Sequence, residues 1–341
     1  MKKKDYSAKS IREDRTIGGM VDASTEFFEG NVRQIIENEI ETYVGAWPLK
    51  KAFLDSIEGG KRLRAFATYL FYRLADGKKE NGAQIAAAME LIHCASLVID
   101  DELDKRNVRP DRNVPTMRGK YSPEEAMMVM ALDVLFAENL VVKATEEFSL
   151  EKKNKIRDLF VRTVCDGGMG EILKWKYIQD RKIPTKKTYW QELVRSSGAL
   201  FFQMACEIGA LTATDDKQKI NKITLIGYKL GELLQAGDDI KDIKEDMRDG
   251  FYSLGVINYY ESLSGANKAA FEKKLKQGFS EQELDSVYAE IIHSAAMEKT
   301  FHELRQKGKE ILELLGGFND SKEKKILVGI VEFLTDRMAL T

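Results

Sequence analysis

The stretch that decides the fold reads LIHCASLVIDDELD over residues 91–104. Its apolar part, residues 91–99, leads directly into three aspartates, Asp100, Asp101 and Asp104. Residues four positions apart lie one above the other on a helix, so a helix would point Asp100 and Asp104 the same way. Carboxylates stacked at the end of a buried segment repel each other unless water or a cation lies between them. The stretch therefore predicts a buried helix that ends in an acidic cluster.

The same acidic pattern occurs a second time, in the stretch LLQAGDDIKD over residues 233–242. Asp238, Asp239 and Asp242 repeat the spacing of the first cluster and again follow an apolar run. At about 100° per residue, Gln235 falls on the same helical stripe as Asp239 and Asp242. The second stretch therefore predicts another helix with a polar line along an apolar body.

Both clusters favour metal–phosphate chemistry. Carboxylate oxygens without histidine or thiolate suit Mg²⁺, which typically takes a few carboxylates, keeps some waters and binds substrate phosphates. One Asp-rich run alone is usually a solvated face, whereas two copies with one spacing, each behind an apolar run, favour a metal site. His93 shares a helical stripe with Asp100 and Asp104. We expect the two helices to face each other across a cavity with the acids at its mouth.

The rest of the chain is predicted to be helical as well. It has 341 residues and five prolines, against about 17 at the usual ~5%, and none follows Pro184. Capping boxes begin at Ser122 and Ser280, where a serine precedes a glutamate three residues later. We predict an all-α fold, a single domain over residues 1–341 with about ten or more helices. The predicted helices span residues 21–45, 50–75, 83–107, 123–147, 151–178, 186–212, 217–248, 281–315 and 321–338.

Composition narrows the classes of protein to which the chain can belong. The formal net charge is −2, which gives no electrostatic footprint for nucleic acid. Three widely spaced cysteines argue against a disulfide framework and suit a reducing compartment. The apolar stretches are too short to span a bilayer, and the basic N-terminus leads to no apolar segment of a signal peptide. We therefore expect a cytoplasmic protein without a membrane span.

Two groups of cations accompany the acidic clusters. Lys61 and Arg64 follow Gly59-Gly60 at the start of a predicted helix and, three residues apart, can converge on one anion. An ordinary helix junction with solvated cations is the alternative interpretation. A second group, Arg106, Arg109 and Arg112, directly follows the first acidic cluster. Arginines beside metal-binding aspartates suit a diphosphate whose oxygens bridge both.

Taken together, these motifs resemble the trans-isoprenyl diphosphate synthases over roughly residues 55–255. The matching elements follow the order of that family: GGKR at 59–62 with Arg64, the 91–104 stretch, Arg109 to Thr116, Asp133-x-Leu135, and Gln235 to Asp242. In the segment from Arg109 to Thr116 the two arginines are split and the loop is longer than in the family pattern. The resemblance implies an all-α class I isoprenoid synthase bundle around a deep central cavity. It also implies a homodimer that condenses isopentenyl diphosphate head to tail with an allylic prenyl diphosphate.

The resemblance further implies a role for each matching residue. Asp100, Asp104 and Asp238 would be catalytic and would bind Mg²⁺ directly, with three ions per active site, and Asp101, Asp239 and Asp242 would assist. Isopentenyl diphosphate would be held by Lys61, Arg64, His93 and Arg112. The allylic diphosphate would be held by Arg109 and Gln235.

Product length in such a synthase would depend on the residues before the first acidic cluster. Ala95 and Ser96 are small, which implies a product longer than C15. Met89 and Ile92 lie further from Asp100 along the helix and would close the end of the cavity. Geranylgeranyl diphosphate, a C20 product, is the expectation. Small residues that merely serve helix packing are an equally good explanation of Ala95 and Ser96.

The chain also departs from the family pattern, mostly on the side of the allylic diphosphate. A Lys-Thr pair is replaced by Ser196-Ser197, with Arg195 adjacent, and a lysine expected near residues 250–253 is absent. The Gly-Gln element falls near Gly168–Glu171 without its glutamine, the Gly-Lys loop after Asp242 is missing, and a later proline is Gly255. Lys241 or Lys244 would be available to compensate.

Two other hypotheses stay open at this stage. The missing lysines favour a related cyclase that ionises an allylic diphosphate without isopentenyl diphosphate, although the retained Lys61, Arg64 and His93 argue against it. The other hypothesis is a non-catalytic subunit of a heteromeric prenyl synthase, against which the two complete acidic clusters argue.

Overall fold

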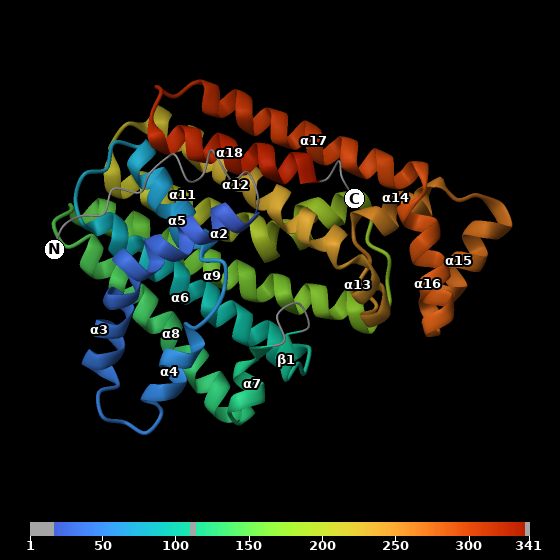
Figure 1. The fold of residues 1–341 in the computed structure, drawn as a ribbon, viewed down its shortest axis with the longest axis horizontal. Coiled ribbons are helices and arrows are strands. Elements are labelled where there is room, and N and C mark those ends of the chain that lie inside the picture. The colour runs from blue at the N-terminus through green and yellow to red at the C-terminus, as the bar shows by residue number, and fades with distance from the viewer. Residues whose placement is uncertain (1–16, 110–113, 338–341) are drawn as a thin grey trace. The chain divides into compact units, whose positions relative to one another are not determined.

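The computed structural model describes residues 17–109 and 114–337 (Figure 1). Helices make up 81% of it, so the all-α prediction is confirmed. Sheet within the described residues is limited to β1, Val108–Arg109, and β2, Val114–Pro115, which pair antiparallel with Val108 opposite Pro115. This pair of short strands lies directly after the first acidic cluster.

Contacts between Cα atoms group the chain into two compact units. Unit 1 comprises residues 1–160, 205–223 and 321–327. Unit 2 comprises residues 161–204, 224–320 and 328–341. The single-domain assignment of residues 1–341 stays a prediction.

Unit 1 contains the first acidic cluster and the Gly-Gly-Lys-Arg segment. Its elements are α2 (Ile17–Phe27), η1 (Phe28–Val32), α3 (Arg33–Tyr43), α4 (Lys50–Ser56), α5 (Leu63–Leu74), α6 (Asn81–Leu103), α7 (Met117–Lys120) and α8 (Pro123–Ala144), together with β1 and β2. It also takes the first part of α9 (Leu150–Gln179), the second part of α11 (Leu200–Ala213), and the first turns of α12 (Lys217–Lys241) and α18 (Lys322–Arg337).

The core of unit 1 is built around α6, which packs against both α5 and α8 (Figure 1). Ile85, Leu91 and the alanines at 86–88 are completely buried, and the small alanine side chains let neighbouring helices approach closely. By length and composition α6 is apolar enough to cross a membrane, but 67% of its most apolar window is buried inside the protein. Burial of this extent is typical of a core helix.

Unit 2 contains the second acidic cluster. Its further elements are α10 (Lys186–Thr188), η2 (Tyr189–Ala199), α13 (Ile243–Asp249), α14 (Leu254–Ser262), α15 (Gly265–Gln277), α16 (Glu281–Ile292) and α17 (Ala295–Gly316). Helix α17 packs against α14, and its Gly308 leaves room for the Thr335 methyl group, because a Cβ there would lie 2.1 Å from Cγ2. This close approach seats the 328–337 part of α18 on α17.

The helix boundaries confirm some of the sequence predictions and correct others. Capping boxes at Ser122 and Ser280 begin α8 and α16 as predicted. The predicted helices 50–75, 217–248 and 281–315 are each broken in two, and α14 and α15 were not predicted. The first break follows from positive φ angles at Gly59, Gly60 and Arg62, which no α-helix accommodates. In the third, the Ser294 side chain caps a new helix by accepting from the backbone NH of Met297.

Candidate active site

The first acidic cluster occupies the last turn of α6. Asp104 caps the helix and its backbone NH donates to the carbonyl oxygen of Asp100 over 2.9 Å. Asp100 is half-buried, whereas the Asp104 side chain is 36% exposed and lies 3.3 Å from Nη2 of Arg106. The structure thus places these two carboxylates one turn apart at the end of a buried helix, as predicted.

Asp101, the middle member of the cluster, points into the protein. It is 5% exposed and accepts two hydrogen bonds from Arg109, over 3.2 Å from Nε and 2.7 Å from Nη2. Burial raises the pKa of the Asp101 carboxyl, although the Arg109 guanidinium opposes the shift. In this structure Arg109 is therefore a partner of Asp101. Arg112, predicted to bind isopentenyl diphosphate, lies outside the described residues.

The Gly-Gly-Lys-Arg segment is fastened to the core through Arg62. Its guanidinium pairs with Glu90 over 3.1 Å, donates to the carbonyl of Ile57, and lies 3.9 Å above the ring of Phe28. The two side chains are buried, at 5% and 1% exposure. The carbonyl of Lys61 accepts a hydrogen bond from the Ser24 hydroxyl over 2.5 Å.

Arg62 and Glu90 were missed as site-forming residues from the sequence. The available signal was Glu90 itself, a single acid inside the otherwise apolar stretch 85–92. A buried carboxylate needs a partner, but the sequence does not tell which cation pairs with Glu90. The cation is Arg62, which precedes Glu90 by 28 residues.

Arg64 and His93 are brought together from α5 and α6. Nη1 of Arg64 lies 2.8 Å from Nε2 of His93. Because a guanidinium only donates, Nε2 accepts in this pair and the imidazole carries its proton on the other nitrogen. Lys61, at the start of the same segment, is half-buried. Three of the four residues predicted to bind isopentenyl diphosphate thus belong to one structural unit.

The residues assigned to product length lie in the core of unit 1. Met89, Ile92 and Ala95 are 2%, 4% and 2% exposed. The Ser96 side chain is half-buried and donates to the carbonyl oxygen of His93 over 2.9 Å. Their role in setting product length stays a prediction.

The second acidic cluster repeats the arrangement of the first. Asp238 and Asp242 are exposed, whereas Asp239 between them is 6% exposed. Asp239 accepts hydrogen bonds from the Tyr189 hydroxyl over 2.6 Å and from Nε2 of Gln235 over 2.9 Å. In both clusters, then, the second aspartate is held by the protein and the outer two lie on the accessible side. Gln235, predicted to bind the allylic diphosphate, here holds Asp239.

The acidic line continues past Asp242 to Asp246 in α13. Burial and the charges of Asp239 and Asp242 raise the pKa of Asp246 well above its usual value. Burial also raises the pKa of Asp239. The charge of Lys174, on α9, opposes both shifts. Lys174 and Tyr189 were not predicted as site residues, because no local pattern connects them to residues 238–242.

The donor set fits a divalent cation that is shared with a ligand. Among the described residues, no group of three or more His, Cys, Asp or Glu side chains is gathered closely enough to hold a metal alone. The accessible pairs, Asp100 with Asp104 and Asp238 with Asp242, offer two carboxylates each. Mg²⁺ is commonly bound in this way, by one or two carboxylates plus water and substrate phosphates.

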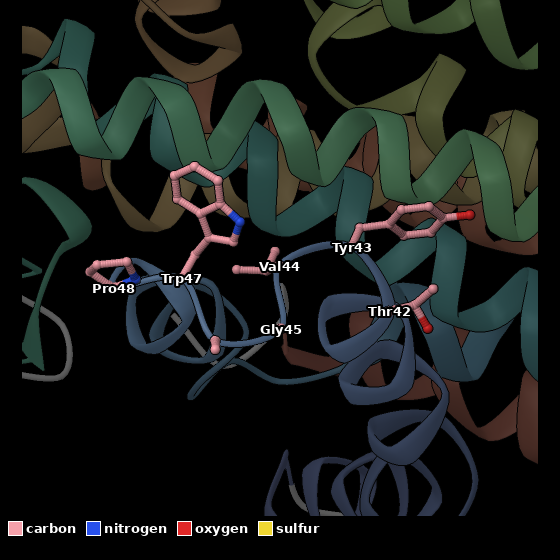
Figure 2. Close-up of a pocket in the computed structure, with 7 residues that line it drawn as sticks. Thr42, Tyr43, Val44, Gly45, Trp47 and Pro48 are labelled. Atoms are coloured by element: carbon pink, nitrogen blue, oxygen red, sulfur yellow. The ribbon is translucent and has the colours of Figure 1, made fainter.

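A surface hollow lies elsewhere in unit 1, at the turn between α3 and α4. It is lined by residues 42–48, among them Tyr43 and Trp47 (Figure 2). Trp47 is 73% exposed. The lining contains no ionisable group other than the Tyr43 phenol, and no predicted site residue lines it. Its composition does not suit a diphosphate.

Known proteins resemble this chain in sequence and in fold. The heptaprenyl diphosphate synthase component 2 of Geobacillus stearothermophilus is 32% identical over 62% of this chain and 62% of its own length. The geranylgeranyl diphosphate synthase of Sulfolobus acidocaldarius is 27% identical over 82% of this chain and 87% of its own.

A solved structure, the polyprenyl synthase of Caulobacter crescentus complexed with calcium and isoprenyl diphosphate, superimposes with a TM-score of 0.80 at 23% identity. It covers 93% of this chain and 98% of its own, and at this identity the likeness shows the fold. The sequence model of the Polyprenyl synthetase family matches residues 48–291, which include both acidic clusters. The chain therefore belongs to the polyprenyl synthetase family of trans-prenyltransferases.

Proposed function

We propose that the protein is a Mg²⁺-dependent synthase that condenses isopentenyl diphosphate head to tail with an allylic diphosphate. The product would be a linear trans-prenyl diphosphate of about C20. The observation that carries the proposal is the repeated arrangement of the two acidic clusters. In each, the second aspartate is fixed by hydrogen bonds, to Arg109 or to Tyr189 and Gln235, and the outer two are accessible.

Asp100, Asp104 and Asp238 are the residues that would hold Mg²⁺, with Asp101, Asp239 and Asp242 in support. When bound, the metal supplies positive charge that stabilises the departing pyrophosphate. Fixing Asp101 and Asp239 keeps the neighbouring carboxylates in a defined orientation. We include three ions per site in the proposal.

The isopentenyl diphosphate would bind at the start of α5. Lys61, Arg64 and His93 come from two adjacent segments of unit 1, and Arg64 already contacts His93. Cations on a fastened backbone segment bind phosphate oxygens without first having to be ordered. Retention of this second diphosphate site favours chain elongation over cyclisation, because a cyclase has only one diphosphate to hold.

The two relatives carry names that refer to products of different length, so length is proposed from Ala95 and Ser96. Both are small and lie four to five residues before Asp100 on α6, where larger side chains would shorten the space for a growing prenyl chain. Met89 and Ile92, one to two turns further from Asp100, are proposed to form the end of that space.

For assembly, we propose a homodimer of this chain in the cytoplasm. Met128, Leu135 and Val142 repeat every seven residues on α8 and are 53%, 55% and 51% exposed. In unit 2, Met169, Ile172 and Trp175 of α9 are 67%, 49% and 43% exposed. Apolar helix faces of this kind are suited to a second copy. A heteromer is the second candidate, because one relative is named as a component of its synthase.

One assay tests the function. Purified protein is incubated with Mg²⁺, isopentenyl diphosphate and dimethylallyl, geranyl or farnesyl diphosphate, and the hydrolysed products are separated by chain length. Longer linear prenols support elongation, with C20 as the expected main product. A cyclic hydrocarbon formed without isopentenyl diphosphate would instead show cyclisation. Turnover that appears only after a partner subunit is added would show the heteromer, and light scattering of the active species gives its mass.

A further inference from the structure

Lys174 lies beside the second acidic cluster although it comes from a different helix. Its ammonium nitrogen is 5.1 Å from the centre of the Phe251 ring. The backbone NH of Phe251 donates to the carbonyl oxygen of Asp246 over 2.8 Å, and the Ser253 hydroxyl donates to the carbonyl oxygen of Asp239 over 3.4 Å. Residues 251–253 therefore connect the lysine to the acidic line. All of these residues belong to unit 2.

The acidic line that residues 251–253 contact carries several carboxylates. Four aspartates follow one another on this line, at 238, 239, 242 and 246. Lys174 is the cation that α9 brings to this line, through its contact with Phe251.

Of the other cations considered from the sequence, Lys244 and Arg195 pair with acids outside this line, whereas Lys241 pairs with Asp242 within it. The ammonium of Lys244 lies 2.5 Å from Asp285, and Nη2 of Arg195 lies 3.7 Å from Asp166. Ser196 and Ser197, which stand where a Lys-Thr pair is expected, donate their hydroxyls to carbonyl oxygens of their own helical turn. Lys241 contacts its own neighbour Asp242 over 3.6 Å.

We propose that Lys174 binds the diphosphate of the allylic substrate at the second acidic cluster. The Lys174 ammonium lies over the ring of Phe251. Phe251 belongs to the segment 250–253, where the family pattern has a lysine that this chain lacks. An ammonium is a compact point charge that contacts phosphate oxygens and offsets the negative charge gathered on a leaving diphosphate. In this chain the positive charge would come from Lys174 of α9 in place of the lysine missing from residues 250–253. This inference rests on the proposed function.

The decisive variant is Lys174→Gln, which removes the charge but keeps much of the stem. One charge-assisted contact corresponds to about a ten- to hundredfold effect. We expect the KM for the allylic diphosphate to rise by about that factor, while the KM for isopentenyl diphosphate stays within twofold. Lys174→Arg keeps the charge and should recover part of the loss. Lys176→Gln, an exposed lysine two residues along the same helix, is the matched control and should behave as the wild type.

A binding measurement separates this inference from the activity. Calorimetric titration of inorganic pyrophosphate with Mg²⁺, at saturating isopentenyl diphosphate, should show about tenfold weaker binding for Lys174→Gln. If the wild type condenses no prenyl diphosphates but this loss is seen, the proposed function is wrong and the lysine's role stands. If Lys174→Gln only lowers the melting temperature and leaves both KM values and pyrophosphate affinity unchanged, Lys174 is merely a counter-ion of Asp239 and Asp246, and the inference is overturned.

Discussion

Nη1 of Arg64 lies 2.8 Å from Nε2 of His93, a contact that joins the start of α5 to the middle of α6. Each side chain thereby fixes the orientation of the other. His93→Ala should leave Arg64 without this support and raise the KM for isopentenyl diphosphate about tenfold, with kcat changed less than threefold, since one hydrogen bond to a charged group is worth ~1.5–3 kcal/mol. Steady-state kinetics with each substrate varied in turn checks this. An equal rise in the KM for the allylic substrate would contradict the assignment.

The outer and inner aspartates of each cluster should differ in their effect on catalysis. Asp100→Ala and Asp238→Ala are expected to lower kcat by about two to four orders of magnitude, because they remove proposed metal ligands. Asp101→Asn keeps the shape of a side chain that already binds Arg109, so its loss should be at least tenfold smaller. Circular dichroism should remain helical in all three variants. Retained activity in Asp100→Ala would refute the proposed metal site.

The buried pair of Arg62 and Glu90 should be essential for stability. Removing one partner leaves an uncompensated buried charge, which typically costs about 3–5 kcal/mol. We expect Glu90→Leu to reduce the free energy of unfolding by that amount in a denaturant titration. The double variant Arg62→Met with Glu90→Leu should recover most of the stability.

Recovery in the double variant should not extend to substrate binding. Without the Arg62 contacts to Ile57 and Phe28, the segment at 59–62 loses the attachment that Arg62 provides, so the KM for isopentenyl diphosphate should stay raised. A double variant with wild-type KM would show that Arg62 serves stability alone.

Asp133 should make the stability of the fold depend on pH. It is completely buried in α8, one oxygen accepts a hydrogen bond from Ser56 over 2.9 Å, and the other has no partner among the described residues. Burial raises its pKa to about 8. An unfolded aspartate has a pKa of about 3.9, so between these values the folded state keeps a proton that the unfolded state has lost.

The sign follows from that difference. The contribution of Asp133 to stability is complete below pH ~4 and is lost as the pH rises towards about 8, by up to ~1.4 kcal/mol per pH unit. Denaturant titrations at pH 5 and pH 8 should show the decline, and Asp133→Asn should flatten it. An unchanged slope in that variant would exclude Asp133 as the source.

Much of the fold was predictable because its signals are local. Proline scarcity indicated a helical chain, and the structure confirms this. The capping boxes at Ser122 and Ser280 depend on neighbouring residues only, and the structure confirms that helices begin there. The predicted range 50–75 ran across the break at residues 57–62, although Gly59-Gly60 was interpreted as a helix start. The left-handed conformation of Arg62 is held by Glu90 and Phe28, which are distant in sequence. Helix α15 buries only Phe271 and Leu275, which is too sparse a pattern to mark a helix.

The candidate site likewise combines residues that were predictable from the sequence with residues that were not. The aspartates were found because one spacing occurs twice, and Arg64 and His93 because they fit the family pattern. Tyr189 and Lys174 act on predicted aspartates from other helices, and Glu90 holds Arg62, which was not predicted either. Only tertiary structure brings these residues together. Sequence patterns identify the groups that meet a ligand more readily than the groups that hold them in place.

The anchoring of Arg62 has a consequence for the rate of substrate capture. A phosphate-binding segment that is ordered only when its ligand arrives must search through many conformations at each encounter. Here the backbone of residues 59–62 is already set by a buried ion pair, a carbonyl contact and an aromatic ring. Isopentenyl diphosphate would meet a binding segment whose backbone is already ordered. Each catalytic cycle could then begin with a productive encounter, without a loop first having to close.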